Sequence, residues 1–168
     1  MATRTTNASK FYIQFTGLDA KPLPIKSVTE VSYEAKVTGG EKPLESTKQG
    51  RSNRQTSSGG FDSSPTMTVE AYLCASEDSS SKVMYNWFNQ AMPTSDGGSG
   101  DWAGSRRSGS VIVYDPDGKT EILRWNFFNA WVKTYSITDA DCTGGELAVE
   151  SYEFVCEKIV KQFSKLGS

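Results

Sequence analysis

The chain of 168 residues has no histidine, few cysteines and no long apolar run. Without histidine it lacks the commonest general base of enzymes and the commonest transition-metal ligand. Cys74, Cys142 and Cys156 are odd in number and lack metal-type spacing, so we expect small buried thiols in a reducing compartment rather than a disulfide framework. No segment reaches the roughly 20 apolar residues that a membrane helix needs, and we therefore expect no membrane insertion by this chain.

A strong charge of one sign is also missing. The net charge is −2 and the isoelectric point is about 5.3, which gives no global electrostatic case for binding nucleic acid or an anionic membrane. The polar N-terminus has no hydrophobic region of the kind found in signal peptides. The length and the 36% hydrophobic content suit one domain over 1–168, with loose tails at 1–9 and 162–168.

Motifs for catalysis are weak throughout the chain. A serine or cysteine nucleophile could be activated here only by lysine or a carboxylate, and Ser79 to Lys82 fits the S-x-x-K pattern only trivially. No glycine-rich loop has the spacing that holds phosphate. Asp115 and Asp117 flank a proline, which is better explained by a tight turn than by calcium binding. We therefore predict no enzymatic activity, no cofactor and no metal site.

The segment Glu121 to Lys133, EILRWNFFNAWVK, is the most hydrophobic part of the chain. Its aromatic and β-branched residues predict a long strand with core positions at Trp125, Phe127 and Trp131. The alternation fails at Phe128, where a polar residue is due, so we expect a β-bulge near Asn129 that changes the buried face.

Three further elements show clear periodicity. Residues 25–37 and 65–74 alternate apolar and polar side chains and are expected to pair as a long hairpin. Residues 83–91 carry an apolar stripe at helical period, with core positions Trp87 and Phe88. Asp78 or Ser79 is expected to cap this helix, and Pro93 to end it.

Two charged segments are of opposite sign. Residues 39–64 contain almost no hydrophobic side chain and carry Lys48, Arg51 and Arg54, without the aromatic residues that nucleic-acid binding favours. A polar connection of this length is usually functional or disordered, and we expect it to order against a partner subunit. The last strand, predicted over 146–157, carries four acids and no base: Glu146, Glu150, Glu153 and Glu157.

These elements amount to six or seven strands, mostly in antiparallel hairpins, with one amphipathic helix. Long strand edges invite pairing with another chain, and a ring that joins them into a closed barrel would remove that liability. From the residues alone we infer a β-rich, self-assembling protein.

The amino-acid sequences of these segments and their order along the chain also resemble those of a known protein family. The chain resembles the tail tube proteins of contractile-tailed phages and of related contractile injection systems, from about residue 10 to residue 161. The segments that carry the resemblance are FYIQFTGLD, VTEVSYEAKVTGG, TKQGR, VMYNWFNQ, VIVYDPDGKTEILRWNFFNAWVK and GGELAVESYEFVCEKI, with RWNFFNAW the most specific.

The resemblance implies a mainly β fold: two packed antiparallel sheets with one flanking helix, as the subunit of hexameric rings that stack into a hollow tube. The lumen-facing residues would be the polar sides of two strands: Glu30, Ser32, Glu34, Lys36, Thr66, Thr68 and Glu70. The opposite sides, which include Val31, Tyr33, Ala35 and Val37, would pack inward; the alternative is that the polar sides face outer solvent. The basic segment of Lys48, Arg51 and Arg54 would reach the acidic last strand of a neighbouring subunit.

The same resemblance implies partners and a location. The partners would be other copies of the chain, a contractile sheath protein, baseplate or spike and terminator proteins, and a cargo of DNA or effector protein in the lumen. The tube would assemble in the bacterial cytoplasm as part of a virion tail or an injection particle. The alternatives are a monomeric β-sandwich that binds a ligand, a hydrolase with a Ser/Lys pair, and a baseplate subunit that initiates the tube.

Overall fold

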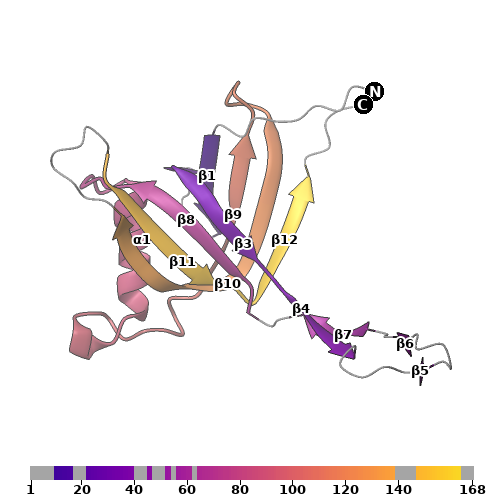
Figure 1. Cartoon of the computed structure of the whole chain (residues 1–168). Helices are drawn as coiled ribbons and strands as arrows, with labels where there is room; N and C mark the ends of the chain where they lie inside the picture. Colours follow the sequence, from indigo (N-terminus) through magenta and orange to yellow (C-terminus); the bar gives the residue numbers. More distant parts are fainter. Residues whose placement is uncertain are drawn as a thin grey trace.

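The computed structural model describes residues 10–16, 22–39, 45–46, 52–53, 56–61, 64–138 and 147–163. Within these residues the chain forms twelve strands, one α-helix and one short 3-10 helix (Figure 1). In chain order the elements are β1 Lys10–Phe15, β2 Leu23–Ile25, β3 Ser27–Ser32, β4 Ala35–Gly39, β5 Glu45–Ser46, β6 Ser52–Asn53, β7 Thr56–Phe61, β8 Thr66–Tyr72, α1 Ser80–Ala91, η1 Thr94–Asp96, β9 Arg107–Tyr114, β10 Glu121–Thr138, β11 Val149–Val155 and β12 Lys158–Phe163.

Strand β10 links two layers of one large antiparallel sheet. Its first half pairs with β9 on one side and β12 on the other, and its second half pairs with β11. We name the two layers sheet A (β2, β1, β9, the first half of β10, and β12) and sheet B (the second half of β10, β11, β8 and β3). The predicted two packed layers are therefore two parts of an eight-stranded sheet that folds over at β10.

A single residue joins the layers at the opposite corner. Lys26 separates β2 in sheet A from β3 in sheet B, and its backbone N–H donates to the Glu70 carbonyl oxygen at 2.8 Å. Because the path of the sheet begins at β2 and ends at β3, this corner brings its two ends together. The result is a rolled, barrel-like sandwich with a common interior.

The interior is filled by aromatic and aliphatic side chains from both layers. Phe127 of sheet A and Phe154 of sheet B are both fully buried, with ring centroids 5.2 Å apart. Trp87 of α1 packs against both rings, with centroid distances of 6.5 Å to Phe127 and 5.5 Å to Phe154, and it lies 5.0 Å from Phe15. Burial of each large side chain contributes about 1.5–3 kcal/mol, so this contact holds the helix against both layers.

The helix follows the sequence pattern closely. Ser79 is the N-cap, and its hydroxyl accepts a hydrogen bond from the Lys82 backbone N–H at 3.2 Å, as predicted. The helix ends one residue before Met92, and Pro93 follows. Met84 and Trp87 are fully buried, while Phe88 is partly buried at the edge of the core.

The predicted bulge lies at Asn129. This residue has a positive φ of 47°, and the register between β10 and β9 shifts between Phe127 and Ala130. Phe127 and Ala130 both point into the core, whereas Phe128 is 42% exposed. The extra residue therefore moves the buried face from odd to even positions.

The bulge also explains why one of the predicted core residues is not in the core. Trp125 packs against the core from a partly buried position, but Trp131 lies on the other face of β10. There its ring makes an edge-on contact with that of Trp102, at a centroid distance of 6.2 Å. Trp131 is thus not a core residue, because the bulge reverses the alternation that placed it there.

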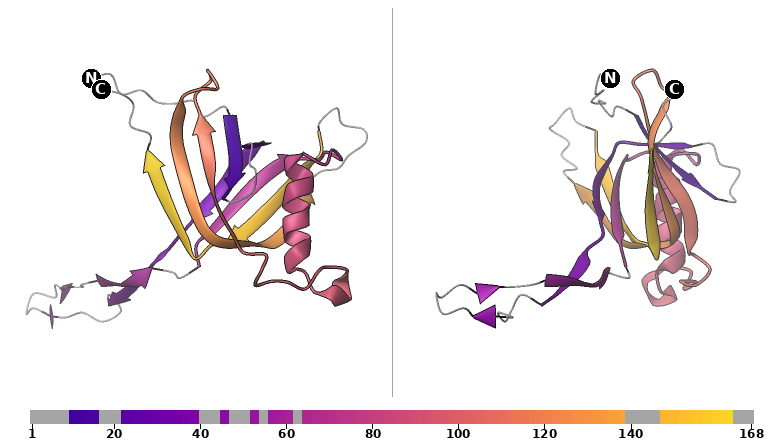
Figure 2. Two further views of the ribbon diagram at one scale, coloured as in Figure 1. Left: turned by 180° about the vertical axis from the view of Figure 1, so that it is seen from behind. Right: turned by 90° about the vertical axis from the view of Figure 1, so that its right-hand side faces the viewer.

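A thin arm projects from the body of the molecule. It consists of β4 paired with β7 and β5 paired with β6, and it continues the direction of β3 away from both sheets (Figures 1 and 2). Residues 25–37 are therefore not one strand of the sheet, since β3 ends at Ser32 and the chain enters the arm at Ala35. The expectation that Tyr33 and Val37 pack inward is wrong: their exposed fractions are 54% and 69%.

Other expected boundaries also shift. Strands β9 and β10 form a hairpin that closes through the turn at Asp115–Gly118, where a tight turn is predicted. The last two strands are distinct: β11 ends at Val155, and the basic segment after it forms β12, which includes residues 162 and 163 of the expected tail. Cys156 is buried as expected, Cys74 is exposed, and Cys142 lies outside the described residues.

Candidate functional site

The outward face of sheet B is a continuous polar surface. The register places Ser32, Thr66 and Val155 in one row, and Glu30, Thr68 and Glu153 in the next. The opposite face of the same strands carries Met67, Val69, Tyr152 and Phe154, all of which are fully buried. Strict alternation between the two faces thus separates the core from this surface.

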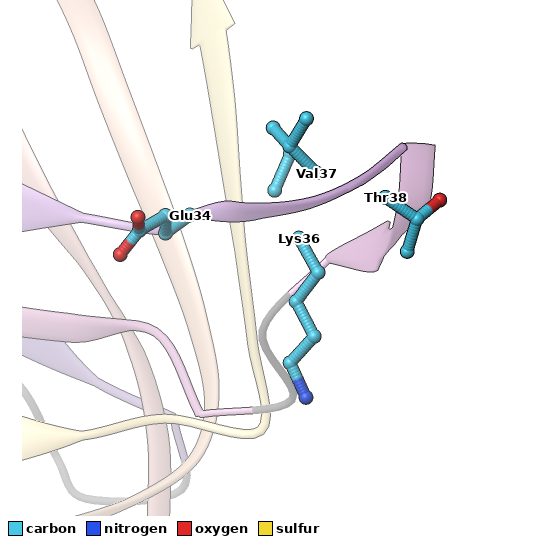
Figure 3. Close-up of a pocket in the computed structure, with 5 residues that line it drawn as sticks. Glu34, Lys36, Val37 and Thr38 are labelled. Atoms are coloured by element: carbon cyan, nitrogen blue, oxygen red, sulfur yellow. The ribbon is translucent and has the colours of Figure 1, made fainter. Parts of the chain in front are cut away.

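Five of the seven residues predicted to line a lumen lie on this outward face. Glu30 and Ser32 come from β3, and they are joined by Thr66, Thr68 and Glu70 from β8. The other two residues, Glu34 and Lys36, lie where the arm begins and not on the sheet (Figure 3). The difference follows from the exit of the chain from sheet B after Ser32.

The charges on the polar surface are partly paired. The Glu70 carboxylate accepts a hydrogen bond from the Ser27 hydroxyl at 2.8 Å and forms an ion pair with the Lys26 ammonium at 3.1 Å. The hydrogen bond from Ser27, with a smaller effect of Lys26, lowers the pKa of Glu70. Lys133 and Glu153 form a second ion pair at 3.5 Å. The charged groups of this surface are therefore of both signs and partly paired.

The second half of β10 and strand β11 also contribute polar residues that sequence reasoning did not include. The register aligns Thr134 with Glu153 and Ser136 with Ser151 on the outward face. The alternation of Ser151 and Glu153 with Tyr152 and Phe154 was a signal for this face.

Two long edges of sheet B have no strand partner within the described residues. One is the edge of β3 that faces away from β8, and the other is the edge of β10 beyond Ala130, where β9 has ended. The edges of sheet A differ, because β2 is short and contains Pro24, and β12 carries Lys158 and Lys161. Proline and lysine on an edge strand oppose pairing with another chain. The open edges of sheet B are therefore better suited to pairing than those of sheet A.

The arm carries the second candidate surface. Glu34, Lys36, Val37 and Thr38 line a shallow hollow at its base, and Val37 and Lys36 point to opposite sides of the ribbon (Figure 3). Thr38 and Ser57 hold β4 and β7 together through their hydroxyls, 2.9 Å apart. Lys48, Arg51 and Arg54, predicted to contact a neighbouring subunit, lie outside the described residues.

The expected acidic partner strand does not form one exposed face. Glu150 is only 3% exposed and points toward the core side of β11. Glu153 pairs with Lys133, and Glu157 lies 3.3 Å from Arg106 and accepts a hydrogen bond from the Asn129 side-chain amide at 2.7 Å. Glu146 lies outside the described residues. Glu150 is therefore not accessible to the arm of a neighbouring subunit, because strand alternation turns it inward.

Glu150 is instead the centre of a buried hydrogen-bond cluster. Its carboxylate accepts hydrogen bonds from the hydroxyls of Ser81 at 2.5 Å, Tyr135 at 2.9 Å and Tyr152 at 2.9 Å. Ser81 lies in the first turn of α1, where the helix dipole favours a negative charge. The cluster thereby fastens the start of the helix to sheet B.

The comparison with protein families identifies the chain. Residues 7–160 match the family described as T4-like virus tail tube protein gp19. The comparison with curated protein sequences gives no match. Among the residues that the structure describes, no helix combines the length and the apolar character that crossing a membrane would require.

Solved structures show the same fold at low sequence identity. The tube terminating cap of the anti-feeding prophage has a TM-score of 0.68 at 15% identity, covering 98% of this chain and 95% of the other. The sheath/tube terminator of the extracellular contractile injection system PVC has a TM-score of 0.67 at 13% identity, covering 96% and 99%. The PVC sheath-tube complex gives 0.64 at 14% identity, covering 95% and 93%. The chain belongs to the T4-like virus tail tube protein family, and its role is that of a structural tube protein.

Proposed function

We propose that this chain forms hexameric rings that stack into the inner tube of a contractile phage tail or injection system. The observation that carries the proposal is sheet B, which combines a polar outward face with two open edges. An exposed edge presents unpaired backbone N–H and C=O groups, and pairing with another strand satisfies them.

The two open edges differ from each other, so their pairing is head-to-tail. The β3 edge of one copy meets the β10 edge of the next copy, which makes the contact heterologous. A heterologous contact generates a ring when its rotation closes, and the four strands of sheet B from each copy then form one continuous barrel. The core of each subunit and α1 lie outside this barrel wall, and the polar face lies inside.

A lumen lined by hydroxyls and paired charges suits passage of cargo. Thr66, Thr68 and Ser151 offer hydrogen bonds that water can replace, and Glu70 and Glu153 each have a lysine partner. Neither DNA nor an effector protein would meet a strong field of one sign on this face. The wall therefore guides the cargo without binding it tightly.

The remaining parts of the proposal follow from the family. A contractile sheath around the tube would supply the energy for penetration, with baseplate or spike proteins at one end and a terminator at the other. The similar chains described above come from tube, sheath/tube terminator and cap assemblies, which supports such partners. The subunit itself would act without catalysis, and the tube would be assembled in the bacterial cytoplasm.

Cross-linking across the two edges tests the ring. Thr29 on β3 and Ser136 on β10 are both exposed, and a Thr29→Cys/Ser136→Cys variant places one thiol on each edge. Cys74 and Cys142 are replaced by serine in this variant, and Cys156 is buried. A short bis-maleimide should give a ladder on a denaturing gel that stops at six subunits, because links that pass from copy to copy close into a circle.

Two outcomes would contradict the edge pairing. One is a particle that stays monomeric in light scattering at every concentration, as a ligand-binding β-sandwich would. The other is assembled rings that show no cross-link between the two positions. Each single-cysteine variant serves as the matched control, since one thiol per copy cannot produce a ladder.

A further inference from the structure

Three aromatic side chains lie together beside the open edge of β10. Tyr85 and Phe88 of α1 both contact Tyr135 of β10, at ring-centroid distances of 5.4 Å and 5.9 Å. Tyr135 belongs to the part of β10 beyond Ala130, which has no strand partner on this side within the described residues. Tyr85 is 40% exposed, and Phe88 and Tyr135 are partly buried. We name Tyr85, Phe88 and Tyr135 the aromatic ridge.

The Glu150 cluster and the core hold the aromatic ridge in place. The Tyr135 hydroxyl donates to the Glu150 carboxylate at 2.9 Å, and the same carboxylate accepts a hydrogen bond from Ser81 in the first turn of α1. Trp87 fixes the middle of the helix, because its side chain is fully buried. A surface that is already held in this way loses little side-chain entropy when a partner covers it.

The other open edge of sheet B has apolar side chains that the subunit covers only in part. Val28 and Val31 lie on the core side of β3 and are partly buried. Their neighbours on β8, Val69 and Met67, are fully buried. The core side of sheet B is therefore incompletely covered at the β3 edge, whereas at the β10 edge it is flanked by the aromatic ridge.

We propose that the aromatic ridge of one copy packs against Val28 and Val31 of the next copy in the ring. The inference rests on the proposed ring, in which β3 of one copy pairs with β10 of the next. A continuous barrel keeps the polar faces of all copies on the lumen side, so alternation places their core faces on the other side, where α1 lies. This holds for every register that keeps the polar face inside. Burial of Tyr85 and of the two valines would add apolar area to the backbone hydrogen bonds of the edges.

The aromatic ridge would also select the partner edge. Pairing of two β3 edges would leave the aromatic ridges of both copies uncovered. Pairing of β3 with β10 covers the aromatic ridge of one copy and the valines of the other in a single contact. The aromatic ridge therefore favours the head-to-tail contact that a ring requires.

A charge on the aromatic ridge tests its part in ring formation. In a Tyr85→Glu variant, the protein concentration at which half of the chains are in rings should rise by roughly tenfold or more, because the contact would bury a carboxylate. Tyr12→Glu is the matched control, since Tyr12 also makes an edge-on ring contact at 5.4 Å, with Tyr114 of sheet A. Sedimentation velocity measures the ring content, and thermal unfolding checks that both variants are folded. Wild-type ring formation by Tyr85→Glu, or an equal loss of rings in the control, would overturn the inference.

Cross-linking supplies a second readout that does not depend on a charged substitution. A Val28→Cys/Tyr85→Cys variant, with Cys74 and Cys142 replaced by serine, carries one added thiol at each edge of sheet B. A short bis-maleimide should link neighbouring copies and give a ladder on a denaturing gel that stops at the size of one ring. Each single-cysteine variant is the control, because one added thiol per copy cannot produce a ladder.

The cross-links also separate this inference from the proposed ring. Rings that give the ladder between Thr29→Cys and Ser136→Cys, but none between Val28→Cys and Tyr85→Cys, would overturn the inference and leave the ring in place. Loss of both ladders would contradict the ring itself, and the packing of the aromatic ridge with it.

Discussion

Glu150 shows at the scale of a single residue how this fold accommodates a buried charge. Its carboxylate forms no ion pair among the described residues and instead accepts hydrogen bonds from three hydroxyls. A buried anion is tolerated when hydrogen bonds and a helix N-terminus replace the water that it loses. Glu150 thus serves the body of the subunit and is not available to a neighbouring arm.

Replacement of Glu150 by alanine should lower the free energy of unfolding by about 3 kcal/mol, because the buried Ser81 hydroxyl loses its acceptor and the Tyr152 hydroxyl keeps only the Ser81 carbonyl oxygen. Glu153→Ala is the matched control on the same strand, and loss of its exposed ion pair should change stability by at most about 1 kcal/mol. Urea unfolding followed by tryptophan fluorescence measures both. Equal effects of the two substitutions would contradict the role assigned to the cluster.

The same cluster predicts a loss of stability at alkaline pH. Burial, together with the hydrogen bond to Glu150, raises the pKa of Tyr135 to about 12 and also raises the pKa of Tyr152. In the unfolded chain both tyrosines ionise near pH 10, so the unfolded state releases protons first. The contribution of the two tyrosines to the free energy of unfolding is therefore fully present below about pH 10. It is lost as the pH rises from there through the folded-state pKa.

Urea midpoints measured between about pH 9 and pH 11.5 should fall steeply for the wild type and less steeply for a Tyr135→Phe/Tyr152→Phe variant. The variant should also be less stable at neutral pH, since it leaves the Glu150 carboxylate with fewer donors. Parallel pH profiles for the two proteins would show that other groups control alkaline unfolding.

At the scale of elements, β10 is the strand that connects the whole sheet. It pairs with β9, β12 and β11, and the bulge at Asn129 lets it face the core on both sides of the fold. The positive φ of this residue is tolerated by asparagine and glycine but disfavours β-branched side chains. The side-chain amide of Asn129 also donates to Glu157 at 2.7 Å, which ties β10 to the start of β12.

Replacement of Asn129 by valine should destabilise the subunit by about 1–3 kcal/mol, because a β-branched residue is strained at this φ. Asn129→Gly removes the same amide contact without the strain, so it should have a smaller effect. Thermal unfolding of the two variants measures the difference. A valine variant as stable as the glycine variant would mean that the backbone conformation at the bulge is not under constraint.

The elements also show which parts of the fold the sequence could predict. Alternation over 66–73 identified both faces of β8, and the failed alternation at Phe128 placed the bulge, because period-two patterns report directly on the face that is buried. The same pattern could not show where the chain leaves the sheet, so Tyr33 and Val37 were expected inside. Glu150 was misplaced because the three hydroxyls that make its burial possible come from two other elements and its own strand.

At the scale of the whole molecule, sheet B is open on both sides. The edges of β3 and of the second half of β10 have no partner within the described residues. In the proposed ring, each edge would pair with the other edge of the next copy, which would satisfy the backbone groups of both.

The polar face of sheet B, which is the proposed lining of the lumen, could be predicted only in part at this scale. Five of the seven residues expected to face the lumen share the outward face of sheet B: Glu30, Ser32, Thr66, Thr68 and Glu70. The other two, Glu34 and Lys36, lie at the base of the arm. The register between β10 and β11 was needed to add Thr134, Ser136 and Ser151, because pairing between distant strands is a tertiary property.

Electron cryo-microscopy of the purified wild-type protein tests the central claim most directly. The account predicts hollow rings or tubes in which β3 of each copy pairs with the second half of β10 of the next copy, with Thr68 and Ser151 facing the channel. A monomeric particle, or an assembly in which sheet B lies on the outer surface and α1 faces the channel, would contradict it.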